Sequence, residues 1–61
     1  MDKSIQSAGA NARAAGCTEF DNPYYKAENM PAATGERAEE WAEKEIAWRL
    51  GWIAEDAIRR D

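Results

Sequence analysis

The chain has 61 residues, which is one small domain at most. At this size a fold buries only about 60% of the surface of its unfolded chain, so stability is marginal without further support. A lone cysteine, Cys17, excludes an internal disulfide, and the lack of histidine removes the commonest general base and metal ligand. With 12 acidic and 8 basic residues the net charge is −4, which disfavours direct nucleic-acid binding and favours a basic protein partner.

The composition predicts helices. Hydrophobic residues make up 44% of the chain, but roughly half of them are alanine and none is valine. The expected fold is all-α: a short N-terminal helix, a long aromatic loop and one long C-terminal helix, a helical hairpin within a single domain of residues 1–61. The core is thin, so we expect a homodimer. No apolar run approaches the ~20 residues that cross a bilayer, and the N-terminal residues lack a signal-peptide core, so we expect no membrane partner and a cytoplasmic location.

Residues 4–15 are predicted to form the first helix. Asp2 or Ser4 is a suitable N-cap, and Gly16 follows where a left-handed residue ends a helix. Small side chains at spacings of three and four are expected to form one flat face: Ile5, Ala8, Ala12 and Ala15. Gly9 weakens this helix, so we expect it to dock on a longer one.

Residues 16–34 are predicted to form the connection. Asn22 precedes Pro23, and proline disfavours a helical backbone at the residue before it, so the pair opens a turn. Such a long connection is unusual in a small domain. We expect its large apolar side chains to fold it down onto a helix: Phe20, Tyr24, Tyr25 and Met30.

Residues 35–60 are predicted to form the main helix, with Thr34 as its N-cap. Acidic residues crowd its first turns, whereas Arg59 and Arg60 occupy its last turn, as the helix dipole favours. Four acid-first pairs at i,i+4 support it: Glu40–Lys44, Glu45–Arg49, Glu55–Arg59 and Asp56–Arg60.

This main helix has two apolar faces. At 100° per residue, one face carries Trp41, Trp48 and Trp52, and the nearly opposite face carries Ile46, Leu50, Ile53 and Ala57. One face can pack on the first helix and the loop, and the other is left for a second subunit or a foreign protein. The alternative is that a single protomer covers both faces. The pattern leaves open which face is core and which is interface.

Three segments in this order resemble the ribosome modulation factor family, short bacterial and phage proteins that include the CrpP-type proteins linked to quinolone resistance. They are Ala12–Gly16, then Asn22-Pro23-Tyr24, then Trp48-Arg49-Leu50-Gly51-Trp52. The resemblance implies two helices joined by a loop, with Gly51 permitting close contact and Trp48 and Trp52 packing on the first helix and Tyr24. It also implies ribosomal RNA binding and ribosome dimerisation, but the founding type is strongly basic, whereas this chain is acidic and has a longer stretch between Tyr24 and Trp48.

No residue combination predicts catalysis, a cofactor or a metal. Cys17 has no histidine to activate it, so a packed or idle thiol is expected. Glu36, Glu40 and Glu43 share one side of the main helix, and a solvated face explains them better than a cation site. A stripe of tryptophans is able to stack bases, but the surrounding positive charge that such binding needs is missing.

The sequence therefore predicts a small non-catalytic regulatory protein that occupies the surface of a larger machine, as a phage-type inhibitor of a host protein does. The alternative, from the resemblance, is a ribosome-associated hibernation or translation modulator. A drug-modifying enzyme is the least favoured reading. The chain is too small to enclose a substrate pocket of ~300 Å³, and it lacks a nucleotide-binding motif.

Overall fold

The computed structural model describes residues 2–60, so Met1 and Asp61 of the predicted domain lie outside the described residues. The described part is helical and contains no strand, which confirms the all-α prediction. Its α-helices are α1 (Lys3–Ala14), α2 (Pro31–Thr34) and α3 (Ala38–Arg59). Three short 3₁₀ turns lie between α1 and α2: η1 (Glu19–Asp21), η2 (Pro23–Tyr25) and η3 (Ala27–Asn29).

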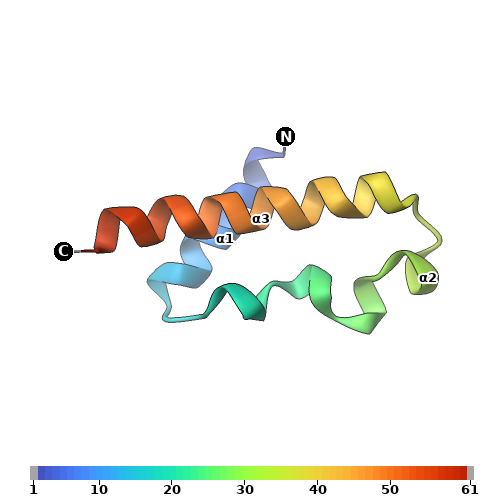
Figure 1. Ribbon diagram of the computed structural model, residues 1–61, viewed down its shortest axis with the longest axis horizontal. Helices are drawn as coiled ribbons and strands as arrows, with labels where there is room; N and C mark the ends of the chain where they lie inside the picture. Colours follow the sequence, from blue (N-terminus) through green and yellow to red (C-terminus); the bar gives the residue numbers. More distant parts are fainter. Residues whose placement is uncertain (1, 61) are drawn as a thin grey trace.

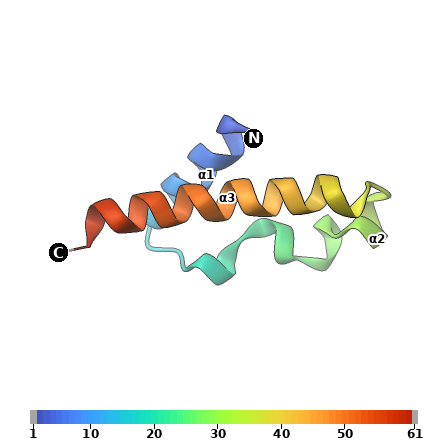
Figure 2. The same cartoon turned by 45° about the horizontal axis from the view of Figure 1, so that its top comes forward.

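The long helix α3 is the axis of the molecule, which measures 41 × 20 × 14 Å (Figure 1). The helix α1 crosses α3, and the chain then runs back along α3 through the 3₁₀ turns to α2. Figure 2 shows α1 and this returning connection on different sides of α3. Both therefore pack on one helix, and α3 supplies most of the core.

Polar caps hold both ends of α1. Asp2 is the N-cap, and its Oδ1 accepts hydrogen bonds from the backbone N–H groups of Ser4 at 2.8 Å and Ile5 at 3.3 Å. At the other end Gly16 has a φ of 91°, and the backbone N–H of Cys17 donates to a carbonyl of the last turn at 2.9 Å. The helix thus begins and ends one residue earlier than the sequence predicts, and Gly16 ends it as expected.

The packing face of α1 is centred on a glycine. Gly9 is buried against α3, whereas Ala8 and Ala15 are exposed, so the expected face is wrong at those two positions. A Cβ on Gly9 would collide with the backbone of Trp48. The helices approach so closely that only a residue without a side chain fits at the crossing, and this contact decides which face turns inward.

The start of α3 also differs from the prediction. Gly35 has a φ of 76° and ends the short helix α2, so part of the expected loop is helical and α3 begins only at Ala38. Thr34, the expected N-cap, is the last residue of α2, and its Oγ1 accepts a hydrogen bond from the backbone N–H of Glu36 at 3.3 Å. Arg37 takes the N-cap position of α3 without a side-chain bond.

Ion pairs follow the predicted spacing with one exception. Three of the expected pairs form: Glu45–Arg49 at 3.6 Å, Glu55–Arg59 at 2.7 Å and Asp56–Arg60 at 2.7 Å. Lys44 pairs instead with Glu36 at 2.9 Å, because the turn before α3 brings that carboxylate back over the helix. Such partly exposed pairs each contribute only a few tenths of a kcal/mol.

Candidate functional site

The tryptophan face of α3 is used inside the protomer. Trp48 is only 3% exposed. The indole Nε1–H of Trp41 donates to the carbonyl oxygen of Tyr24 at 2.7 Å, and that of Trp52 donates to the carbonyl oxygen of Cys17 at 2.8 Å. The indoles of Trp41 and Trp52 therefore extend from α3, and the polar edge of each holds a segment of the connection.

A buried asparagine fixes the middle of the connection. Asn22 is 1% exposed; its Nδ2 donates to the carbonyl oxygen of Glu45 at 3.2 Å, and its Oδ1 accepts from the backbone N–H of Tyr24 at 3.0 Å. The Tyr25 hydroxyl donates to Oε1 of Glu45 at 2.8 Å, and this hydrogen bond raises the pKa of Tyr25 above 10.0. The turn at Pro23 is thus bound to Glu45 of α3 by one buried and one partly buried hydrogen bond, which rigidify it.

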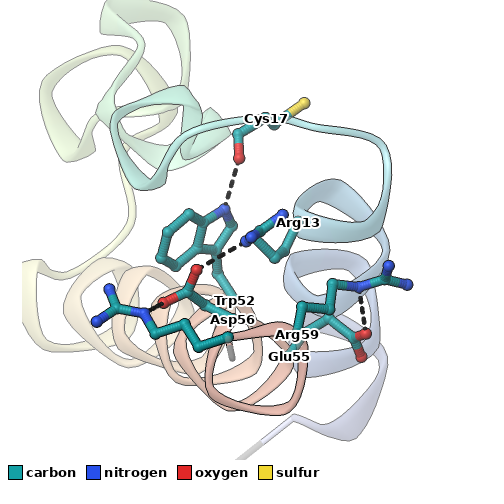
Figure 3. Close-up of polar contacts among 7 residues, drawn as sticks. Arg13, Cys17, Trp52, Glu55, Asp56 and Arg59 are labelled. Atoms are coloured by element: carbon teal, nitrogen blue, oxygen red, sulfur yellow. Dashed lines mark hydrogen bonds and ion pairs between the residues drawn. The ribbon is translucent and has the colours of Figure 1, made fainter.

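A charged cluster joins the end of α1 to α3 (Figure 3). The Arg13 Nε donates to Oδ1 of Asp56 at 2.8 Å, and the Arg60 Nε donates to Oδ2 of the same carboxylate at 2.7 Å. The Arg13 guanidinium also lies 5.8 Å from the ring centroid of Trp52, at cation–π distance. The hydrogen bond from Arg13, followed by that from Arg60, lowers the pKa of Asp56.

The opposite side of α3 carries an exposed apolar strip, which we call the α3 strip: Ile46, Leu50, Ile53 and Ala57. Leu50 is 43% exposed and Ile53 is 44% exposed, Ala57 is also exposed, and Ile46 is half-buried. Of the two faces that the sequence distinguishes, the structure thus buries Trp48, half-buries Trp41 and Trp52, and leaves most of the α3 strip open.

A second exposed apolar site lies on η1 and its N-cap Thr18, residues 18–21, which we call the Phe20 turn. Phe20 is 79% exposed, so the expectation that it folds onto a helix is wrong. The Asp21 carboxylate accepts hydrogen bonds from the backbone N–H of Thr18 at 2.8 Å and from its hydroxyl at 3.2 Å, which closes the turn and turns Phe20 outward. The Thr-x-x-Asp pattern was the sequence signal for this turn.

Phe20 lines two surface hollows, of about 360 Å³ and 480 Å³. The first also contains Trp52 and Asp56, the second contains Tyr25 and Lys26, and Cys17 lines both. The arrangement places an exposed aromatic ring between two shallow depressions with mixed apolar and charged walls. Such a surface fits a macromolecular partner better than an enclosed small molecule.

Among residues 2–60 no three His, Cys, Asp or Glu side chains are grouped to hold a metal ion. No helix in the same range is long and apolar enough to span a membrane. Comparisons with protein-family models, curated proteins and solved structures gave no match to this chain.

Proposed function

We propose that this chain is a small non-catalytic regulatory protein that binds the surface of another protein and inserts Phe20 there. The observation that carries the proposal is the 79% exposure of Phe20 on a turn held by the Thr18–Asp21 hydrogen bonds. A turn whose backbone is held before binding loses little backbone conformational entropy on association. Aromatic residues also supply a large share of the binding energy in protein interfaces.

The charges around the turn define the chemistry of the partner. Glu19 and Asp21 flank Phe20, and the whole chain carries a net charge of −4. The complementary surface is an apolar pocket with a basic rim, because opposite potentials steer association and suppress wrong partners. The buried Asn22 behind the turn keeps this surface in place through its bond to α3.

The ion pairs that the arginines form within the protomer disfavour ribosomal RNA as the target. Four arginines each pair with a carboxylate of this chain: Arg13, Arg49, Arg59 and Arg60. Arg13 and Arg60 share the Asp56 carboxylate, so three carboxylates offset most of the charge of these four arginines within the protomer, which leaves less of it for phosphate groups. The resemblance to the ribosome modulation factor family implies the ribosome as an alternative target.

An affinity pull-down from a bacterial lysate tests the proposal. The baits are the wild type, Phe20→Ala, and Ile58→Ala as a matched control, because Ile58 is 77% exposed but lies on α3 away from the turn. We expect one protein to be retained by the wild type and by Ile58→Ala after nuclease treatment. We expect Phe20→Ala to lose it, and raised salt to release it.

Three results contradict the proposal. Equal retention by Phe20→Ala would show that the turn is not the binding surface. Retention that nuclease abolishes, together with co-sedimentation with ribosomal particles, would favour the ribosome instead. A bait that retains no protein would remove the basis for a binding function.

A further inference from the structure

We propose that the α3 strip is the interface of a symmetric homodimer in which two copies of α3 pack antiparallel. The strip residues lie outside the Phe20 turn, although a hollow beside Ile53 and Ala57 also includes Glu19 of that turn, and the proposal goes beyond the proposed binding function. Leu50 and Ile53 form its centre, and both are more than 40% exposed in the protomer. A small domain gains most from covering such a strip, since its own core is thin.

The spacing of the α3 strip fits a helix–helix seam. Its four residues follow one another at intervals of four, three and four positions, from Ile46 to Ala57. This is the spacing of core positions in a coiled coil, where apolar side chains of one helix insert between those of the other. The neighbouring positions Ala47 and Ala54 are small, and Ala47 is fully buried. The strip is therefore narrow and suits one partner helix.

One antiparallel register pairs every apolar residue of the strip with another. It sets Leu50 of each copy opposite Ile53 of the other copy, and Ile46 opposite Ala57. The large Ile46 then meets the smallest member of the strip. Ala57 and Ile53 also line a surface hollow of about 330 Å³, which this isoleucine of the second copy is placed to fill.

The charges at the two ends of the strip select the antiparallel orientation. The same register sets Glu43 of each copy opposite Arg60 of the other, so opposite charges meet at both ends. Glu43 lines a hollow of about 210 Å³ together with Asp2, Ile5, Glu40 and Lys44. The Arg60 side chain is 76% exposed and shares the Asp56 carboxylate of its own chain with Arg13, so its charge is not fully compensated there. A parallel dimer would instead set glutamate against glutamate and arginine against arginine, which is repulsive. The two-fold symmetry then makes each favourable contact occur twice.

Sedimentation equilibrium over a wide range of protein concentration tests the dimer. The wild type should approach twice the 6.8 kDa mass of the protomer. Leu50→Glu should weaken association by about a hundredfold or more, because each dimer contains this change twice. Ile58→Glu introduces the same charge on the same helix but off the strip, so it should leave association within about twofold. Circular dichroism checks that each variant keeps its helices.

Charge exchange tests the orientation without touching the core. Glu43→Arg and Arg60→Glu should each weaken the dimer by about tenfold, and the double variant should restore it. A wild type that stays at 6.8 kDa at every concentration would overturn the dimer, as would a dimer that Leu50→Glu leaves intact. A double variant no tighter than the single variants would overturn the antiparallel register.

Discussion

Gly9 and Gly51 meet at the crossing of α1 and α3, where each faces the backbone of the other helix. A Cβ on Gly9 would collide with the carbonyl oxygen of Trp48, and one on Gly51 would collide with that of Gln6. The contact is reciprocal, and both clashes involve backbone atoms that have no rotamer to change. The two glycines therefore set the distance between the helices.

Gly51→Ala should destabilise the protein by about 2–3 kcal/mol, because the helices must separate to admit the methyl group. At an exposed helical position the same change would instead stabilise by roughly 0.5–1 kcal/mol. Urea unfolding measures the difference. Ala54→Gly, at an exposed position on α3, is the comparison and should cost only about 1 kcal/mol. A neutral or stabilising Gly51→Ala would contradict the close approach.

Asn22→Ala should cost about 2–3 kcal/mol. The change leaves the carbonyl of Glu45 and the N–H of Tyr24 without the bonds that the buried amide supplies. Chemical denaturation of the variant gives the loss. Asn11→Ala, at an exposed position on α1, is the matched control and should be neutral or slightly stabilising. If the two variants lose equal stability, Asn22 does not fix the connection.

The free energy of unfolding should decrease at acid pH, because Asp56 is then protonated and loses its pairing with the arginines. The hydrogen bonds from Arg13 and Arg60 hold the pKa of Asp56 below 3.8, so this group contributes stability above its unfolded pKa and loses it as the pH falls through its folded pKa. The stability difference between wild type and Asp56→Asn should be constant above about pH 6 and shrink below about pH 4. Urea midpoints measured against pH give this difference. If the stability difference between wild type and Asp56→Asn does not change with pH, Asp56 is not paired.

Much of the fold follows from local sequence patterns. The caps of α1, three of the four acid-first pairs and the two apolar faces of α3 depend on residues a few positions apart, and these were predictable. Gly16 ends α1 as its sequence position indicates, because a positive φ there is cheap for glycine. The start of α3 was missed because Gly35 was expected within the helix, whereas its left-handed backbone separates α2 from α3.

The features that define the candidate sites depend on contacts distant in sequence. Gly9 is a poor helix former, so it weakened the prediction of α1. The close approach of α3 explains why a glycine stands at this position. Which face of α3 is covered depends on where the connection lies, and the indole bonds of Trp41 and Trp52 to that connection settle it. Phe20 was expected to fold onto a helix because it is hydrophobic, whereas the turn that contains it leaves it 79% exposed.

The Trp48 side of α3 is the core of the protomer, and the Leu50 side is free. The most direct test compares Trp48→Ala with Leu50→Ala by urea unfolding, at concentrations where the wild type is monomeric. Trp48→Ala should cost about 3–5 kcal/mol, since Trp48 is 3% exposed, whereas Leu50→Ala should cost less than about 1 kcal/mol. Equal losses, or a larger loss for Leu50→Ala, would contradict the assignment.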